Sequence, residues 1–282
     1  MLSTARRARE GLANRAGGVL HFVLSRLTDD GGFRGRGERA DLYYTAFALQ
    51  CLMAMEAKIP PATVGYIKQF GAGEKLDFVH LCCLARCRNL LGGGFSEAPG
   101  LARRLERYRC ADGGFSVLPD AACGSAYGAF LATGAFQDMA QSMPQPQRLM
   151  ESLKMLRVVS GGYANDARVG LAATSATAAA MIVMRQGGLP AECGTAQWLR
   201  RQRRDGGFLA IAAAPIPDLL STATAIHALA ATGQSLDDLR APCRRFLDSL
   251  WSPTGGFRAN QADETVDVEY TFYGLLAEGH LG

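Results

Sequence analysis

Two arginines in a glycine-containing loop are the first residues of this chain whose types and spacing suggest chemistry. Arg36 and Arg39 lie between the turn Gly31-Gly32-Phe33 and Asp41, where we expect a helix to begin. A guanidinium group presents a fork of donors to phosphate oxygens, and the free N–H groups of a helix start add to such a site. The pattern predicts diphosphate binding. The alternative is a solvated loop in which Glu38 is the local partner.

The turn before these arginines recurs along the chain. From Gly113 onward, successive copies are 45–49 residues apart, and a degraded copy at 70–73 fills the gap between the first two clear ones. A period of about 40–50 residues indicates a stack of similar units, so we expect six units. The clear copies are Gly31-Gly32-Phe33, Gly113-Gly114-Phe115, Gly161-Gly162-Tyr163, Gly206-Gly207-Phe208 and Gly255-Gly256-Phe257.

Each unit is predicted to contain two helices of different character. The first has a one-sided apolar stripe, typical of a helix with one wet face, and the second is apolar or small nearly all round, typical of an enclosed helix. The first kind is expected near 5–27, 60–70, 98–109, 145–157, 190–203 and 236–251, and the second near 41–56, 76–90, 120–134, 167–186, 218–232 and 267–281. The second helices open with Asp41, Asp77, Asp120, Asp218 and Asp267, each expected to cap its helix.

Six such hairpins predict an all-α fold, an α/α toroid with an inner and an outer ring of six helices. The paired glycines allow the chain to fold back tightly between the rings. We expect a single domain over residues 1–282, because the repeat runs through the whole chain. An open superhelix of helix pairs is the alternative, but such proteins usually have shorter repeats and no turn of this kind.

Composition and charge exclude several functional classes. A net charge of +4 without a run of Lys and Arg among aromatics does not favour a nucleic-acid partner. The eight cysteines lack the paired spacing of secreted proteins and indicate reduced thiols. No apolar run approaches the roughly 20 residues that cross a bilayer. We therefore expect a cytoplasmic protein, with attachment to a membrane surface as an alternative. The basic N-terminal segment is interpreted as an outer helix rather than a transit segment.

These features resemble the prenyltransferase/squalene-cyclase repeat family, and the β-subunits of protein prenyltransferases most of all. In that family a Gly-Gly-Phe turn is followed by an Arg, a Lys and a Tyr that hold an isoprenoid diphosphate. Arg36, Arg39 and Tyr44 fall on these positions, and the resemblance covers nearly the whole chain. It implies an enzyme, a transferase with an isoprenoid diphosphate or other lipid-like substrate, and a helical α-subunit-like chain as a candidate partner.

The resemblance also implies zinc as a candidate cofactor. Asp41 falls on the family's zinc-binding Asp after a one-residue deletion, and His80 falls on the zinc-binding His one repeat later. The zinc-binding Cys is replaced by Tyr43, which is a poor ligand, although Cys83 lies one helical turn beyond His80 and is a candidate substitute. The alternative is that His80 and Cys83 are core residues. Loss of the Cys puts thiol prenylation itself in doubt.

The last unit contains a second family-like segment, Asp267-Val268-Glu269-Tyr270-Thr271. It is similar to the acidic motif of class II terpene cyclases, in which a protonated carboxyl protonates an alkene. The resemblance implies that Glu269 is the acid and Asp267 its orienting partner. Tyr270 replaces an acid of that motif, and those cyclases usually place the site between two barrels. The alternative is that Asp267 caps a helix and Glu269 lies on a polar rim.

Aromatic residues of the inner helices are expected to line a central cavity. Aromatic faces suit isoprenoid chains and the carbocations formed from them. We expect an isoprenoid-diphosphate-binding enzyme that transfers or rearranges a prenyl group. The alternatives are a class II cyclase-like enzyme and a non-catalytic toroid that binds a lipid or a partner protein. The residues expected to line the cavity are Tyr43, Phe47, Tyr270, Phe272 and Tyr273.

Overall fold

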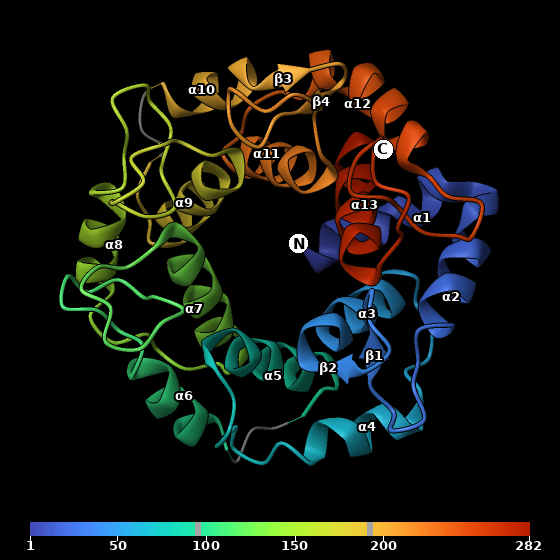
Figure 1. The fold of residues 1–282 in the computed structure, drawn as a ribbon, viewed down its shortest axis with the longest axis horizontal. Helices are drawn as coiled ribbons and strands as arrows, with labels where there is room; N and C mark the ends of the chain where they lie inside the picture. The colour runs from blue at the N-terminus through green and yellow to red at the C-terminus, as the bar shows by residue number, and fades with distance from the viewer. Residues whose placement is uncertain (94–96, 191–193) are drawn as a thin grey trace. The chain divides into compact units, whose positions relative to one another are not determined.

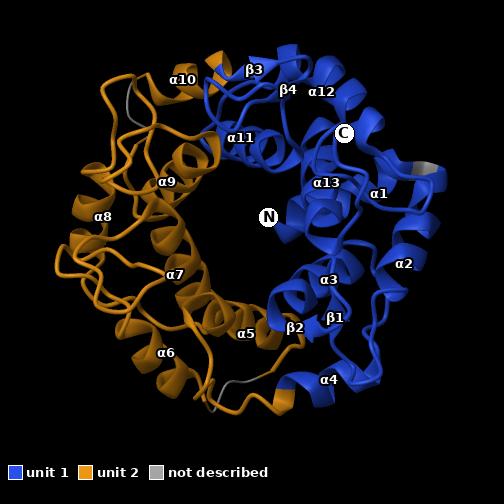
Figure 2. Cartoon of the chain, viewed as in Figure 1, with its two compact units in different colours: residues 1–67, 202–282 blue, residues 68–201 orange. Residues whose placement is uncertain are grey.

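Helices joined by short turns make up most of the chain. The structure is a computed structural model that describes residues 1–93, 97–190 and 194–282. Contacts divide the chain into two compact units, unit 1 formed by 1–67 and 202–282 and unit 2 by 68–201 (Figure 2). None of the helices in the described ranges is long and apolar enough to cross a membrane. The predicted single domain over 1–282 stays a prediction.

Unit 1 contains both ends of the chain (Figure 1). Helix α13 packs against α1, α3, α11 and α12, so the last repeat lies directly against the first. Two short antiparallel pairs, β1 with β2 and β3 with β4, lie in the turns. The elements are α1 (Leu2–Leu12), η1 (Ala13–Arg15), α2 (Ala16–Leu24), β1 (Phe33–Arg34), β2 (Ala40–Asp41), α3 (Leu42–Ala54), α4 (Pro61–Lys68), β3 (Arg203–Arg204), β4 (Gly207–Phe208), α11 (Leu219–Ala231), α12 (Asp237–Leu250) and α13 (Val268–Leu281).

Unit 2 repeats the same alternation. Helices α5, α7 and α9 pack side by side in sequence order, α6 covers α5, α8 lies against α7 and α9, and α10 lies against α9. The predicted difference between the two helix types is present: α9 is buried along most of its length, whereas α8 buries only Leu149, Ser152 and Leu153. The elements are α5 (Phe78–Leu90), α6 (Ala98–Glu106), α7 (Ala126–Asp138), α8 (Pro146–Lys154), α9 (Thr174–Gln186) and α10 (Thr195–Arg201).

The Gly-Gly-aromatic turns share one local geometry. In each clear copy the first glycine has a positive φ, and the aromatic residue is 0–1% exposed. At Gly255, φ is +101° and an added Cβ would lie 2.0 Å from the carbonyl oxygen of Gly18, so the turn of the last repeat requires glycine. In four turns the aromatic N–H donates to a threonine hydroxyl in the next helix, as Phe208 does to Thr222 Oγ1 at 2.9 Å.

Four of the five predicted aspartate caps are confirmed. The carboxylates of Asp41, Asp77, Asp218 and Asp267 each accept a hydrogen bond from the backbone N–H three residues later, at 2.7–2.9 Å. The fifth prediction, Asp120, is wrong. That residue lies in a loop with φ of +59°, and the hydroxyl of Ser125 caps α7 instead.

Several predicted helix boundaries differ from the structure. Helix α9 starts at Thr174 rather than near 167, because Ala164 and Ala172 pair as an extended bridge. The N-terminal helix expected over 5–27 is interrupted by the single turn η1. Of the helix expected near 190–203, residues 191–193 lie outside the described residues, and Arg203 belongs to β3.

Candidate active site

The first turn of α13 places two carboxyl groups two residues apart in unit 1. Asp267 is the N-cap of this helix, and its Oδ1 accepts from the backbone N–H of Tyr270 at 2.9 Å. Its side chain is only 1% exposed. An aspartate at this position is favoured because it satisfies a free N–H group and opposes the helix dipole. The geometry follows from local sequence, but the burial does not.

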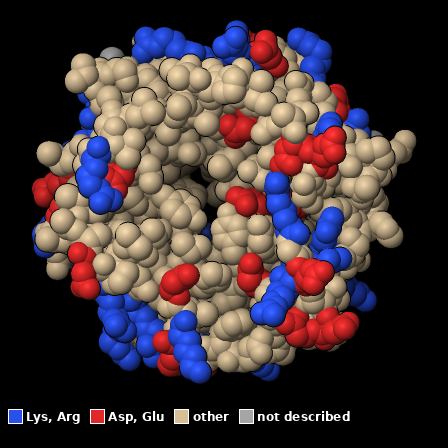
Figure 3. Space-filling view, in the orientation of Figure 1, with Lys and Arg blue, Asp and Glu red and all other residues tan. Residues whose placement is uncertain are grey.

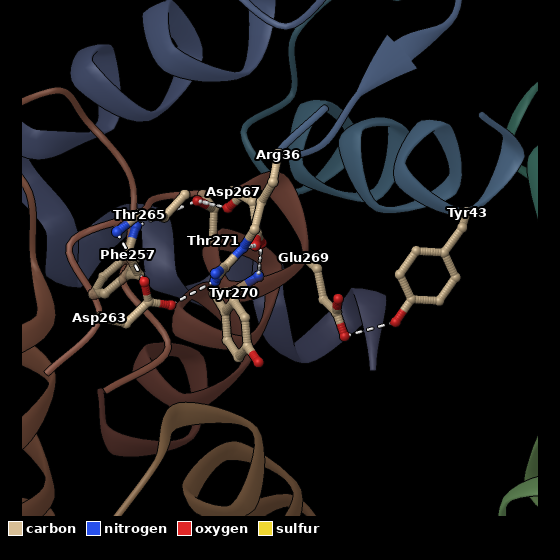
Figure 4. Close-up of polar contacts among 9 residues, drawn as sticks. All are labelled: Arg36, Tyr43, Phe257, Asp263, Thr265, Asp267, Glu269, Tyr270 and Thr271. Atoms are coloured by element: carbon tan, nitrogen blue, oxygen red, sulfur yellow. Dashed lines mark hydrogen bonds and ion pairs between the residues drawn. The ribbon is translucent and has the colours of Figure 1, made fainter. Parts of the chain in front are cut away.

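Arg36 contacts Asp267 from the loop between β1 and β2. Its Nε donates to Asp267 Oδ2 at 2.8 Å, and its Nη2 donates to Asp263 Oδ2 at 2.6 Å. The guanidinium carbon lies 5.6 Å from the centre of the Tyr270 ring. The hydrogen bond with Asp267 raises the pKa of Arg36 above its usual value. Arg36 therefore bridges two acids of the segment that precedes α13 (Figure 4).

Glu269 has a different and neutral partner. The hydroxyl of Tyr43, on α3, donates to Glu269 Oε1 at 2.7 Å. Burial raises the pKa of the Glu269 carboxyl, the bond from Tyr43 lowers it, and the charge of Asp267 raises it, with a net increase. Figure 4 shows Glu269 extending toward Tyr43, whereas Asp267 faces Arg36. A partly buried carboxyl with a raised pKa is suited to carry a proton.

Aromatic rings of α3 and α13 cluster around Tyr43, the partner of this carboxyl. Phe47 lies 5.0 Å from the ring of Tyr43, 5.8 Å from Phe272 and 5.6 Å from Tyr273, measured between ring centres. Phe272 is 1% exposed and belongs to the core of unit 1. Tyr43, Phe47 and Tyr273 are partly exposed. Three rings of the predicted cavity set are thus available to a ligand next to Glu269. Tyr270 instead lies beneath Arg36.

Comparison with known proteins decides the family. The prenyltransferase alpha-alpha toroid domain matches residues 10–162 and 190–278. The chain belongs to this family. The predicted all-α toroid class and the predicted family are therefore confirmed. No curated protein sequence matches the chain.

Several solved structures align with this chain along most of its length. The type II terpene cyclase MstE from Scytonema, bound to its substrate geranylgeranyl dihydroxybenzoate, aligns with a TM-score of 0.65 at 15% identity and covers 97% of both chains. A protein from Actinoplanes aligns with a TM-score of 0.65 at 17% identity, covering 95% of this chain and 98% of that one. Geranylgeranyltransferase-I from Candida albicans, in complex with GGPP, aligns with a TM-score of 0.55 at 13% identity, covering 95% and 76%. At these identities the likeness concerns the fold.

The three residues predicted to bind diphosphate in this toroid have unequal surroundings. Arg36 is bound to two carboxylates, as described above. Arg39 is exposed and makes no hydrogen bond or ion pair with any described residue. Tyr44 lies over Gly35, where an added Cβ would come within 2.2 Å of its ring, so this tyrosine holds the loop backbone. Figure 3 shows acidic and basic side chains beside one another on this face of unit 1, with no patch of one sign.

The residues predicted to bind zinc each have another role. Asp41 caps α3 in unit 1. In unit 2, His80 Nδ1 lies 2.8 Å from Asp77 Oδ1, and Cys83 is buried on α5. Nowhere in the described ranges do three His, Cys, Asp or Glu side chains form a group that fits a metal. Zinc binding stays a prediction, and we derive no chemical step through zinc.

Unit 2 contains a polar pocket that sequence reasoning did not find. Its volume is about 360 Å³, and Lys75, Asp77, Arg104, Arg107 and Tyr108 are among the residues that line it. Glu74, also in its wall, pairs with Arg104 at 3.0 Å, and Asp77 caps α5. Hydrogen bonds lower the pKa of Glu74 and, despite burial, that of Asp77, whereas burial raises the pKa of Glu269, so we favour the carboxyl pair of unit 1 as the site of chemistry.

Two contacts of the candidate site in unit 1, those of Asp263 and of Tyr43, were not predicted from the sequence. Asp263 was not singled out, although its Oδ1 accepts from the N–H of Thr265 at 2.9 Å, a local turn for which an Asp two residues before a Thr is a weak signal. Tyr43 was expected only as a cavity residue and as the replacement of the zinc-binding Cys. Its hydrogen bond to Glu269 joins residues 226 positions apart, and no local sequence pattern indicates such a contact.

Proposed function

We propose that this toroid is a class II terpene-cyclase-like enzyme that starts the cyclisation of an isoprenoid chain by protonating an alkene with Glu269. The observation that carries this proposal is the pair of carboxyls with separate partners: Asp267 bound to a cation, and Glu269 bound to the neutral Tyr43. From the sequence, prenyl transfer is the first prediction and cyclisation the second. Arg36 is the main residue expected to bind a diphosphate, and two carboxylates already pair with it. We therefore place cyclisation first.

The proposed step is redox-neutral. The proton leaves a carboxyl oxygen of Glu269 and bonds to one carbon of an alkene, whose electron pair forms the new C–H bond. The carbocation left behind is attacked by the next alkene of the same chain, which closes a ring. Loss of a proton from carbon to water ends the reaction, and Glu269 regains a proton from solvent, so the product is an isomer of the substrate. The partly exposed rings of Tyr43, Phe47 and Tyr273 would face the positive charge.

The length of the chain is consistent with this chemistry. Two features of the sequence oppose it: acids of the motif are replaced by Glu269 and Tyr270, and such cyclases usually place the site between two barrels. A type II terpene cyclase that aligns over 97% of both chains supports the proposal against the second of these objections. That cyclase is described with geranylgeranyl dihydroxybenzoate as substrate and merosterolic acid A as product. We therefore propose a polyprenyl chain attached to a polar head as the substrate class.

Prenyl transfer remains the second candidate because of Arg39. Its guanidinium is exposed and has no ion-pair partner among the described residues, so it is available to a phosphate. Under this hypothesis Arg39→Gln weakens binding of geranylgeranyl diphosphate at least tenfold, and pyrophosphate is released during turnover. Under the cyclase hypothesis no pyrophosphate is released.

Substitution of the proposed acid is the decisive experiment. Glu269→Gln keeps the shape of the side chain and removes the proton, so cyclised product should fall by about 10²–10⁴-fold, the usual size of an acid–base contribution. The substrates are geranylgeranyl diphosphate and geranylgeranyl dihydroxybenzoate, and products are followed by mass spectrometry. Glu278→Gln is the matched control, because Glu278 is a second buried glutamate of α13 whose pKa is also raised by burial.

The outcomes separate the three functions. Loss of cyclised product in Glu269→Gln but not in Glu278→Gln supports the cyclase. Release of pyrophosphate by both variants identifies a transferase and contradicts the proposal. Binding of the prenyl substrates without any product in the wild-type protein identifies a non-catalytic lipid-binding toroid and also contradicts it.

A further inference from the structure

The second repeat, in unit 2, lacks most of the loop that the other repeats place before their inner helix. In the clear turns the first glycine precedes the N-cap of the next helix by 10–12 positions, as Gly113 precedes Ser125. Gly73 is the matching glycine of the second repeat, because its N–H donates to the carbonyl three residues before it, as that of Gly113 does. The N-cap Asp77 follows Gly73 after only four positions.

The aromatic residue of the turn is also absent from the second repeat. In the clear copies it follows the first glycine by two positions and is 0–1% exposed. At this position the second repeat has Lys75, which is exposed. An ammonium group stays in water, whereas a phenylalanine ring enters the core. The short loop and the missing ring account for the pocket of about 360 Å³, which lies where α5 begins and α6 ends (Figure 1).

The charged groups of this pocket are unequally engaged. The carboxylate of Glu74 accepts a hydrogen bond from Arg104 at 3.0 Å, and that of Asp77 caps α5. Lys75 and Arg107 also line the pocket, and neither side chain makes a hydrogen bond or an ion pair with any described residue. A pocket whose acids are bound and two of whose cations are free in this way favours an anionic ligand.

The rest of the pocket wall is largely apolar. Leu76, Leu81 and Pro119 line it together with Tyr108. The ring of Tyr108 packs against Phe78, with 5.2 Å between the ring centres. Small-molecule sites are cavities of about 300–1,000 Å³ that combine apolar walls with a few polar groups. The pocket therefore suits a ligand with an anionic group and an apolar body.

We propose that this pocket binds a small phosphorylated molecule, with the phosphate held by Lys75 and Arg107 and the apolar part against Tyr108 and Pro119. A phosphate monoester carries about −1.5 to −2 charges at neutral pH, which two cations match. A guanidinium presents parallel donors to phosphate oxygens, and an ammonium adds a point charge. All these residues belong to unit 2, and the site does not depend on the proposed cyclisation.

Calorimetric titration of the full chain with phenyl phosphate and with inorganic phosphate tests this assignment. Phenyl phosphate should bind at one site per chain and at least about tenfold more tightly than inorganic phosphate, because only the ester has an apolar body to bury. Lys75→Gln and Arg107→Gln should each weaken binding of phenyl phosphate at least about tenfold, because each removes a hydrogen bond to a charged group. Both side chains are exposed, so both variants should fold normally.

Glu74→Gln should act in the opposite direction. It removes the carboxylate that pairs with Arg104 in the pocket wall and makes that guanidinium available to the ligand. Affinity for phenyl phosphate should therefore rise at least about threefold. A purely structural role of Glu74 would leave the affinity unchanged or lower it.

Arg103→Gln is the matched control. Arg103 lies on the same helix, α6, is exposed, and does not line the pocket. Its substitution should leave the affinity for phenyl phosphate unchanged. Absence of binding by both phosphates, or an equal loss of affinity in Arg103→Gln and Arg107→Gln, overturns the proposal. Equal affinity for the two phosphates contradicts the role given to Tyr108 and Pro119 and identifies a site for free phosphate.

Discussion

The hydroxyl of Tyr43 donates a 2.7 Å hydrogen bond to Glu269, joining the first turn of α3 to the first turn of α13. One oxygen of the carboxyl accepts this bond, which leaves the other oxygen to carry a proton. The tyrosine stands where the resemblance places a zinc-binding cysteine. The substitution that weakens the case for a zinc enzyme therefore supplies the partner of the proposed acid.

Tyr43→Phe should move the pH dependence of activity. The bond from Tyr43 lowers the pKa of Glu269, so its removal raises that pKa, and the alkaline limb of kcat moves to higher pH. Loss of one oriented hydrogen bond of about 1–1.5 kcal/mol should reduce kcat about tenfold. Rate measurements over pH 5–9 test both effects. A limb that stays in place would show that this bond does not act on the acid.

Gly255→Ala should strongly destabilise the protein. The added Cβ would meet the backbone of Gly18, and φ is +101°, so strain and overlap combine. We expect a loss of at least about 2 kcal/mol in the free energy of unfolding, measured with urea. Gly17→Ala on α2 is the control, because its Cβ would meet nothing within 4 Å. It should be neutral or stabilising by up to about 1 kcal/mol.

Thr222→Val should show how much the hydrogen bond between a turn and the threonine of the next helix contributes to stability. The N–H of Phe208 donates to Thr222 Oγ1 at 2.9 Å, and both residues are 0% exposed. Leaving a buried N–H without a partner costs about 1–3 kcal/mol, visible as a lower urea midpoint. Thr224→Val, whose hydroxyl donates only to backbone carbonyls of its own helix, should change stability by less than half as much. Equal effects would contradict this account.

His280 should make stability depend on pH. Burial, together with the charges of Arg7 and the N-terminus, lowers its pKa to about 4 from the usual histidine value of 6.5. The unfolded chain therefore binds this proton at a higher pH than the folded protein does. The contribution of His280 to the free energy of unfolding is fully present above about pH 6.5. It decreases as the pH falls toward 4, by an amount on the order of 3 kcal/mol.

His280→Gln removes that proton and should flatten the stability curve between pH 6.5 and 4. Urea unfolding at several pH values measures the change. The substitution also removes the hydrogen bond with His227, whose Nδ1 lies 2.9 Å from His280 Nε2. A wild-type slope retained in the variant would assign the pH dependence to other groups.

Local rules were sufficient for much of the architecture. The positive φ at Gly31 and Gly255 favours glycine, and a carboxylate before an apolar helix caps it, as Asp41 and Asp218 do. These features depend on neighbours within a few residues, so the repeat, the two helix types and the family were all accessible from the sequence. The start of α7 was not, because Asp120 and Ser125 are both acceptable caps, and in the folded chain Ser125 caps the helix while Asp120 has a positive φ.

The candidate site depended on contacts between distant segments. Sequence alone marked Arg36, Tyr43, Asp267 and Glu269 as residues of interest, and a resemblance suggested their partners. Only the tertiary structure joined Arg36 to Asp267 and Tyr43 to Glu269, across more than 220 positions in each case. The physical reason is that a charge or a proton is assigned by burial and by the groups within hydrogen-bonding distance, and both are properties of the folded chain.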